Sequence, residues 1–489
     1  MRKKTFYAIH VITILLVISL RVLGQDGYPR VKIVHYGVGH GDCTLIIVSD
    51  RDKDNRDEIK TVSVLIDVGG RGFEARRHWD EIWQRIRNEG GDRLNFFVVS
   101  HFHKDHMGAA ERILQQIRPA VPGQPESYPW RTSMKIIDRS VFVNNDQTLN
   151  YIAWAPPTSG TVTRYLQEVN NQSHWSLSQR PELRAGDDLF AGYNLKSSQM
   201  ICIVSNGVIG ITRRAQPRIA NVPPPPTVRS ENDLSFAFIL RAGSFRYYTG
   251  GDLSGGDIPY SPAIPPQPAQ PGQPGQPGQP ARPGRRAIDG QSAMEPPLAS
   301  YLRLNDTFGD SFHTCALKFN HHGSRNSTTA DFMGIFNPRI GVFTANHRRF
   351  GSGRLPADEV IARIENRQYP PGNQNPVLLY TFRFDETLDP TRRVGRNNVP
   401  VIAYQDIIMS VTDEADASLF TGQAPRIRLF RQERQIRRFV RRGVEVPHRL
   451  PHRGGTPPPF NNTFRCDRTP HTITPLRYFP PPPAPQPPE

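Results

Sequence analysis

Short apolar runs that end in polar or glycine-rich turns recur along this chain and predict β-strands. Four of these runs cover residues 64–66, 94–100, 245–249 and 316–319. Runs of this length, bounded by turn residues, are typical of strands that are buried in a sheet. Histidine or aspartate residues follow each of the four runs, and neighbouring strands can deliver such residues to one rim. The pattern therefore predicts a β-rich core with a polar site at one edge.

The densest of these polar groups is His-Phe-His-Lys-Asp-His at residues 101–106. His101 and His103 are two positions apart, so at a strand end they project from the same side of the backbone and can bind one ion. Asp105 and His106 fall on the following turn and can serve a second ion, as in hydrolytic two-metal sites. Imidazole and carboxylate ligands suit zinc. A solvated polar loop is the alternative, but it rarely carries this density of ligands.

Three further groups accompany this motif. Asp67 begins an Asp-x-Gly-Gly turn, Asp252 ends the segment Tyr-Thr-Gly-Gly-Asp, and the segment 321–324 reads His-His-Gly-Ser.

In this order, the motifs resemble those of the metallo-β-lactamase fold superfamily, whose signature is His-x-His-x-Asp-His. The chain is most similar to the branch that contains the extracytoplasmic domain of the competence protein ComEC and its secreted relatives. Four segments carry the resemblance to that branch: 38–46, with His40 in place of a glutamine; 232–240, with Asn-x-x-Ser before a strand; 248–252, with one extra glycine; and 321–327. A final element is only partly kept, as Asn346, Phe350-Gly351 and Leu355-Pro356. The resemblance covers about residues 30–425.

The resemblance implies an α/β fold, a four-layer αββα sandwich, and two zinc ions per chain as cofactors. It implies that His101, His103 and Asp252 hold one ion, that Asp105, His106 and a histidine of the 321–322 pair hold the other, and that Asp252 bridges them. We assign His322 to the ligands and Asp105, His321 and His322 to catalysis, although the motif leaves open which histidine of the pair ligates. The other would donate a proton or stabilise an oxyanion.

Four residues are expected to support the ligands. Asp42 and Asp67 would orient them by hydrogen bonds, since ligating histidines usually need an outer partner. Asn232 belongs to the matched motif, and Ser324 could contact a phosphate oxygen, with turn capping as the equal alternative. His174 is the one histidine between the 101–106 motif and the Asn232 strand, and we consider it as a further ligand.

The fold alone does not choose a substrate, because metallo-β-lactamase-like folds host lactam, lactone, thioester and phosphodiester hydrolysis. The ComEC-like resemblance favours an exported zinc-dependent metallo-hydrolase, a phosphodiesterase or nuclease, in which two ions lower the pKa of a shared water. The alternatives are a lactamase- or lactonase-type amide or ester hydrolase, favoured if His174 is a ligand, and a metal-stabilised surface-binding protein without catalysis.

Residues 1–24 combine a basic start, an apolar run and a small residue before Gln25, which predicts a secretory signal peptide. An uncleaved membrane anchor is the alternative. We therefore expect a periplasmic or secreted protein. The four cysteines, at positions 43, 202, 315 and 466, have no paired short spacing and do not predict a zinc site.

We predict a catalytic domain over 25–425, with a Pro/Gly/Gln-rich loop insertion at 258–286, and a basic, Pro-rich C-terminal tail over 426–489. The insertion and the tail are expected to be extended and disordered. The tail has thirteen arginines and four acidic residues, so it carries +9 of the net charge of +16. Arginines of the tail could contact nucleic acid or an anionic surface, and a last strand with a solvated stalk is the alternative. A hydrolysable phosphodiester is the expected substrate, and no partner protein is predicted.

Overall fold

The computed structural model describes residues 28–39, 41–70, 73–91, 93–117, 129–140, 159–210, 230–255, 294–304, 314–338, 340–345, 348–350, 353–365, 376–381, 393–394, 399–400, 403–404, 406–412, 426–430 and 463–465. The predicted signal peptide, the 258–286 insertion and most of the predicted tail lie outside this part of the chain. None of the helices it contains is long and apolar enough to cross a membrane.

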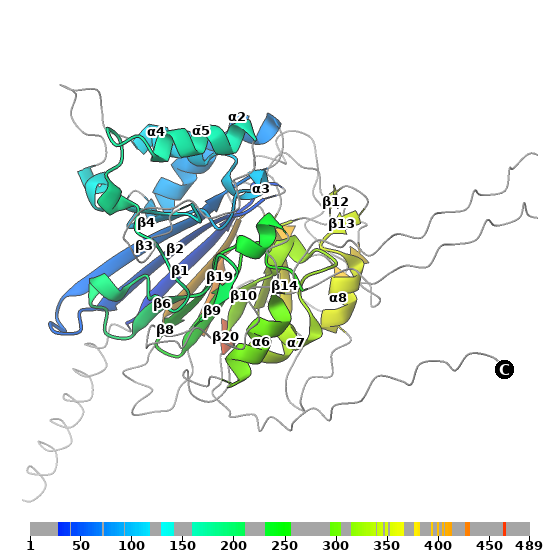
Figure 1. The fold of residues 1–489 in the computed structure, drawn as a ribbon. Helices are drawn as coiled ribbons and strands as arrows, with labels where there is room; N and C mark the ends of the chain where they lie inside the picture. The colour runs from blue at the N-terminus through cyan, green and yellow to red at the C-terminus, as the bar shows by residue number, and fades with distance from the viewer. Residues whose placement is uncertain are drawn as a thin grey trace, which may run out of the picture.

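Two eight-stranded sheets form the centre of the described structure (Figure 1). The first sheet has the order β20 (Thr463–Arg465), β19 (Arg426–Phe430), β18 (Asp406–Thr412), β1 (Arg30–Tyr36), β2 (Cys43–Arg51), β3 (Ile59–Val68), β4 (Phe96–Val98) and β5 (Lys135–Ile137). Its strands β1 to β3 are antiparallel, whereas β3, β4 and β5 run parallel.

The second sheet has the order β17 (Ala403–Tyr404), β14 (Val377–Thr381), β11 (Ile340–Phe343), β10 (Ala316–Lys318), β9 (Phe245–Thr249), β8 (Ala237–Ala242), β6 (Ser198–Ser205) and β7 (Val208–Ile209). Strands β9, β10, β11, β14 and β17 are parallel to one another. The four apolar runs singled out in the sequence lie in β3, β4, β9 and β10, so those strand predictions are confirmed.

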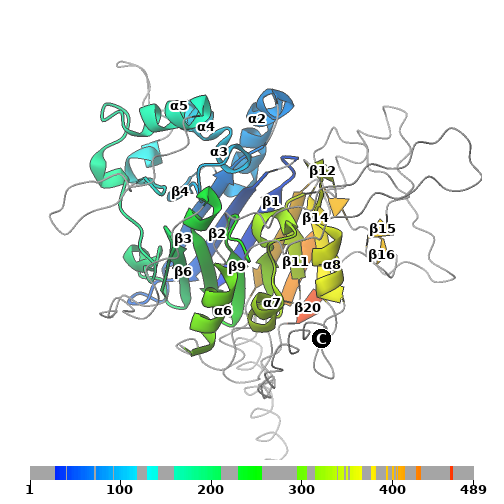
Figure 2. The ribbon, with the colours of Figure 1, turned by 45° about the vertical axis from the view of Figure 1, so that its right-hand side comes forward.

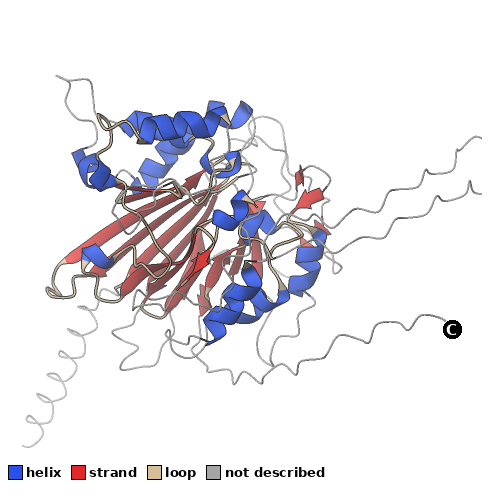
Figure 3. Ribbon diagram, in the orientation of Figure 1, coloured by secondary structure: helices blue, strands red, loops and turns tan. Residues whose placement is uncertain are grey.

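Helices cover the outer face of each sheet, as the blue helices on either side of the red strands show in Figure 3. The first sheet carries α2 (Phe73–Ile86), α4 (Ala110–Ile117) and α5 (Gly160–Val169), and the second carries α6 (Glu295–Leu304), α7 (Ala330–Phe336) and α8 (Asp358–Glu365). The turned view of Figure 2 shows the same two groups of helices on opposite sides of the sheets. The four-layer αββα sandwich expected from the resemblance is confirmed.

The alternation of apolar residues along the strands produces these layers. In β1, Ile33 packs between the two sheets while its neighbour Val34 packs under the helices of the first sheet. In β8, Phe238 points between the sheets and Ile239 points toward the helices of the second sheet. Because successive side chains of a strand leave on opposite faces, a strand that is apolar at both positions can be buried on both sides.

Two short hairpins, β12 (Arg348–Phe350) with β13 (Gly353–Leu355) and β15 (Arg393–Val394) with β16 (Val399–Pro400), lie outside the large sheets. The predicted domain boundary at residue 425 falls directly before β19, which pairs with β18, so the first sheet continues into the segment assigned to the tail. Cys43 and Cys202 are buried thiols, and Cys315 is disulfide-bonded.

Described residues on the two sides of the 258–286 insertion are joined by hydrogen bonds. The carbonyl of Ser254, two residues after the 248–252 motif, accepts hydrogen bonds from the backbone N–H groups of Met294 and Glu295 at 2.8 and 3.0 Å. The chain therefore leaves the site and returns to it at one place.

Candidate metal centre

The ligand-type residues of the sequence motifs meet at one edge of the sandwich. Each follows or ends a strand that belongs to a parallel pair: Asp67 in β3, His101 and His103 after β4, Asp252 after β9, and the histidine pair in the short 3-10 helix η6 (Asn320–Gly323) after β10. The carboxyl ends of parallel strands face the same edge of a sheet, which is where open α/β sheets bind ligands.

The buried carboxylate of Asp252 lies between two sets of imidazoles. Its Oδ1 is 2.9 Å from Nε2 of His106 and 3.7 Å from Nε2 of His322. Its Oδ2 is 3.7 Å from Nε2 of His101 and 3.7 Å from Nε2 of His321. One oxygen thus faces each set, an arrangement that would allow the carboxylate to bridge two ions.

The first metal-capable group consists of His101, His103 and Asp252. Nε2 of His101 is 3.0 Å from Nδ1 of His103. Ligand atoms about 2.0–2.1 Å from a tetrahedral zinc ion stand roughly 3.3 Å apart. The separations of 3.0 Å and 3.7 Å in this group scatter around that value, so the three side chains fit one ion with little movement.

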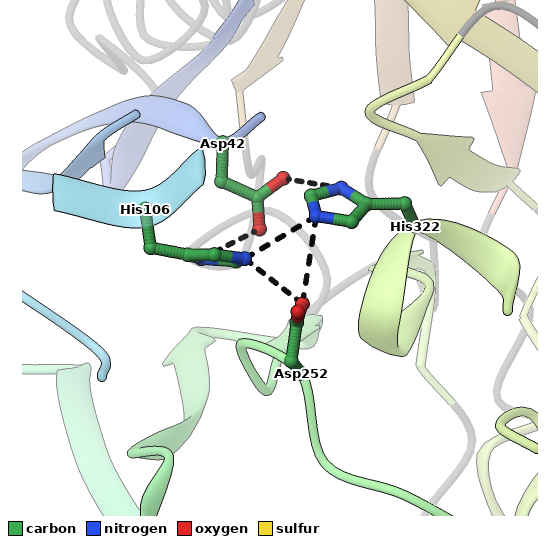
Figure 4. Close-up of side chains that lie close together, drawn as sticks. All are labelled: Asp42, His106, Asp252 and His322. Atoms are coloured by element: carbon green, nitrogen blue, oxygen red, sulfur yellow. Dashed lines mark hydrogen bonds and ion pairs between the residues drawn. The ribbon is translucent and has the colours of Figure 1, made fainter. Parts of the chain in front are cut away.

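The second metal-capable group consists of Asp42, His106, Asp252 and His322, all buried. Nε2 of His106 is 3.3 Å from Nε2 of His322, which is again the spacing of two ligands of one ion. Figure 4 shows the two carboxylates on opposite edges of this imidazole pair. Asp252 lies on the Nε2 edge, whereas Asp42 lies on the Nδ1 edge, 3.4 Å from His322 and 3.5 Å from His106.

The donor set passes a simple test for a divalent ion. Oδ1 of Asp252 is buried and makes no hydrogen bond in the described structure, apart from its ion-pair contacts with the two imidazoles. An ion at the centre of the group would satisfy this oxygen. Asp105 lies beside the same position, because its Oδ2 is 3.8 Å from Nε2 of His322. Imidazole and carboxylate ligands are the set that zinc prefers.

Asp67 and Ser100 orient two of the imidazoles from behind. Nδ1 of His106 donates to Oδ2 of Asp67 at 2.8 Å, and the other carboxylate oxygen accepts from the backbone N–H of Ser100 at 2.7 Å. The Ser100 hydroxyl donates to Asp67 at 2.7 Å and lies 3.1 Å from Nδ1 of His101. With both Nδ1 atoms used in this way, the Nε2 lone pairs of His101 and His106 face the centre.

Two buried glutamates hold the ligand-bearing loops. Glu231, in the 3-10 helix η5 (Glu231–Leu234), accepts from the backbone N–H of Phe102 at 2.8 Å and pairs with the buried Arg139. Glu295 accepts from the Asn320 side chain and from the backbone N–H groups of Thr328 and Thr329, at 2.7–2.8 Å. The first glutamate fixes the His101–His103 loop, and the second fixes the loop that carries the histidine pair.

The local backbone is unusual where the loops meet. His321 and His322 have φ values of +48° and +51°, in the left-handed region that residues other than glycine seldom adopt. Such conformations cost about 1–3 kcal/mol each and persist where the surroundings impose them, often at functional sites. Gly69 lets two loops touch, because a Cβ there would lie 1.7 Å from the carbonyl oxygen of Asp105. This contact explains why the first glycine of the Asp-x-Gly-Gly turn cannot be a larger residue.

The electrostatics of the group favour cations. Burial by itself would raise the pKa of Asp252, but the charges of His106, His321 and His322 outweigh it and hold the pKa well below its usual value. Burial would lower the pKa of His106, but Asp252, Asp42 and Asp67 raise it well above the ordinary value for histidine. Asp252 thus attracts positive charge to the Nε2 edge, and a metal ion there would displace the proton held by the imidazole.

The structure places the remaining candidates as follows. Asn232 is buried in η5 and its Oδ1 has no hydrogen-bond partner among the described residues, whereas its neighbour Glu231 holds the His101–His103 loop through Phe102. The Ser324 hydroxyl donates to Asn326 within its own turn. His174 lies outside both metal-capable groups, with Nδ1 3.0 Å from Glu168.

Sequence reasoning missed five polar residues around the ligands. They are Ser100, Thr344, Lys318, Glu231 and Glu295, whose contacts are with Asp67, His322, Asp42, Phe102 and the 320–329 loop. Position in the sequence gives a signal for three of them, because Ser100 precedes His101, Lys318 ends the strand before the histidine pair, and Glu231 precedes Asn232. Thr344 and Glu295 have no such signal.

The fold and the ligand arrangement together define a protein of the metallo-β-lactamase fold with a candidate two-metal centre. No protein-family model matches the chain, and no curated protein matches it.

Three solved structures are similar to the chain at low identity. The metallo-β-lactamase fold protein YhfI from Bacillus subtilis is 12% identical to this chain. The match covers 47% of this chain and 65% of the YhfI chain, with a TM-score of 0.24. A long form of RNase Z from yeast is 10% identical, and the match covers 73% of this chain and 42% of the RNase Z chain, with a TM-score of 0.32. A diphosphatase of the PhnP family is 11% identical, and the match covers 71% of this chain and 94% of the diphosphatase chain, with a TM-score of 0.29. The fold assignment therefore rests on the layers, strand order and ligand positions of this chain itself.

Proposed function

We propose that this protein is a zinc-dependent hydrolase of phosphodiesters, related to the ComEC-like branch of the metallo-β-lactamase superfamily and exported from the cytoplasm. The observation that supports it most is the placement of Asp252, which turns one carboxylate oxygen toward each of two imidazole sets. Two bound zinc ions would supply Lewis acidity and activate a water molecule near neutral pH.

The residues of the chain would divide the work. His101, His103 and Asp252 would hold one ion, and His106, His322, Asp105 and Asp252 the other. Asp67 and Asp42 would fix the imidazoles from their Nδ1 edges, where they already lie. This fixed geometry lowers the reorganisation needed when charge develops on the scissile centre.

His321 suits a role in contact with the substrate. Its side chain is 21% exposed, whereas those of His101, His106 and His322 are fully buried. Its Nδ1 is buried without a hydrogen-bond partner among the described residues, whereas Nδ1 of each of the three others lies beside a carboxylate or hydroxyl. A less constrained imidazole beside the ions could donate a proton to the leaving group or stabilise an oxyanion.

A phosphodiester substrate is the preferred class because of the ComEC-like motifs. The lactamase- or lactonase-type alternative is weakened by the position of His174, which contacts Glu168 rather than the metal-capable groups. Residues 1–24 support export, and N-terminal sequencing of the mature protein would test it, with a start near Gln25 expected. The arginine-rich tail remains a candidate contact for nucleic acid or an anionic surface.

The test combines zinc analysis of the purified protein with hydrolysis of bis-p-nitrophenyl phosphate, single-stranded DNA and nitrocefin. We expect about two zinc ions per chain and cleavage of phosphodiesters, abolished by Asp105→Ala and unaffected by Asp57→Ala, which changes an exposed aspartate far from the ligand loops. Cleavage of nitrocefin alone would favour the lactamase class. Bound zinc without turnover of any substrate would favour a metal-stabilised binding protein.

A further inference from the structure

A buried lysine lies beside the candidate metal centre. Lys318 is the last residue of β10, a central strand of the second sheet, and its side chain is 2% exposed. Lysine is almost never fully buried unless it is paired. The metal ligands themselves need no lysine, so the function proposed above gives this residue no role.

The ammonium of Lys318 joins loops that carry different ligands. Its Nζ is 2.5 Å from Oδ2 of Asp42, in the loop between β1 and β2, and donates to the carbonyl of Gly251 at 3.1 Å. Gly251 directly precedes Asp252, and its carbonyl also accepts from the backbone N–H of His321 at 3.1 Å. One cation thus links the two sheets at the point where three ligand-bearing segments meet.

Asp42, the partner of this lysine, contacts both imidazoles of the second group. Its two carboxylate oxygens lie 3.4 and 3.5 Å from the Nδ1 atoms of His322 and His106, on the edge opposite the metal position (Figure 4). Its backbone accepts from Gly69 and donates to the carbonyl of Asp105, each at 2.8 Å. A shift of Asp42 would therefore move both imidazoles of the second group.

Charge explains why a lysine is needed at this position. Burial by itself would raise the pKa of Asp42, but Lys318, with His322 and His106, lowers that pKa far below its usual range. An unpaired Asp42 carboxylate would be costly in this interior, and it would compete with Asp252 for cations. When it is paired with Lys318, the Asp42 carboxylate stays on the Nδ1 edge of the two imidazoles.

We propose that Lys318 is a positioning residue, which fixes the Asp42 carboxylate so that it orients His106 and His322 toward the second ion. This inference rests on the metal centre proposed above. The alternative is an ion pair that only joins the two sheets, which would contribute to stability and leave metal affinity unchanged.

The test compares four variants of the full chain: Lys318→Met, Asp42→Asn, the double variant, and Arg180→Met. The last is a matched control, because it removes another buried cation, which is paired with Asp138 at 2.8 Å, and neither residue belongs to a metal-capable group. The measurements are the two zinc dissociation constants, by competition with a chromophoric chelator, the visible spectrum of the Co²⁺ form, and the thermal stability of the metal-free protein.

A positioning role predicts that Lys318→Met raises the dissociation constant of the second ion, held by His106 and His322, about 10- to 100-fold, the usual effect of losing an outer partner. The Co²⁺ spectrum of that site changes, while the other ion and Arg180→Met keep wild-type affinity. The double variant has no unpaired buried charge, so it stays folded even if Lys318→Met does not, and we expect its affinity to be reduced as well.

Two results would overturn the inference. If the double variant binds both ions as the wild type does, the pair is only structural. The same holds if Lys318→Met lowers the melting temperature without changing either dissociation constant, as expected for Arg180→Met. A wild-type protein that binds no zinc would instead refute the proposed function, and the inference with it.

Discussion

Replacing Asp67 by asparagine tests whether the outer hydrogen bonds control the second ion. The carboxylate accepts three bonds, from the backbone and hydroxyl of Ser100 at 2.7 Å each and from Nδ1 of His106 at 2.8 Å. Asp67 has a φ of +56°, and asparagine adopts this left-handed conformation readily. The substitution therefore changes the charge and one acceptor while the backbone stays in place.

The size of the effect follows from the contacts that an amide cannot make. Its single oxygen can keep the bond from the Ser100 backbone. Its NH₂ group then faces the N–H of His106, so that bond is lost, and the Ser100 hydroxyl must turn to accept from the amide instead of donating. A hydrogen bond to a charged group contributes about 1.5–3 kcal/mol. Since 1.4 kcal/mol is a factor of ten, the dissociation constant of the second ion should rise about 10- to 100-fold.

Chelator competition measures both ions in Asp67→Asn and in Ser100→Ala, which removes the hydroxyl beside Nδ1 of His101. We expect Asp67→Asn to weaken mainly the ion bound by His106, and Ser100→Ala mainly the ion bound by His101. Equal weakening of both ions in both variants, or no change in Asp67→Asn, would refute the reasoning, because the two imidazoles would then not depend on their own outer partners.

Three further predictions follow from local contacts. Gly69→Ala should strip zinc from the protein, because its Cβ would overlap the carbonyl of Asp105, whereas Gly192→Ala, with open space around it, should retain two ions by metal analysis. Phe238→Ala empties the layer between the sheets and should lower the free energy of unfolding by about 3–5 kcal/mol in a urea titration. Burial would raise the pKa of Asp138, but Arg180 and its other partners lower it, so Asp138 stabilises the fold above about pH 4 and this contribution is lost as the pH falls through the lowered pKa. Asp138→Asn should therefore be less stable than the wild type at pH 7, with a difference that shrinks in acid; a constant difference would contradict this.

The strands and the ligand loops could be predicted because their signals are local. The apolar run before residue 101 is a strand whichever partner it finds, and a His-x-His pair at its end converges for reasons of strand geometry alone. The layers were predicted only through the resemblance, since a strand that is apolar on both faces does not reveal which face meets helices and which meets the other sheet.

The outer contacts could not be predicted because their partners are far apart in the sequence. Glu231 accepts a hydrogen bond from the backbone N–H of Phe102, which is 129 residues away, and pairs with Arg139, which is 92 residues away. A glutamate before the Asn232 motif has no pattern that distinguishes it from a surface residue. Asp42 was expected to orient ligands, yet nothing in the sequence indicated that Lys318 would neutralise it from the opposite sheet.

The hydrogen bonds from Met294 and Glu295 to Ser254 have an evolutionary consequence. They join the chain on the two sides of the segment between Gly255 and Met294, so the positions of both ends are fixed beside the ligand-type residues. Once such ends are fixed, doubling the length of a flexible loop costs only about 0.6 kcal/mol. Descendants of this protein could thus lengthen, shorten or exchange that segment and acquire new attachments, while the geometry of the candidate metal centre is inherited unchanged.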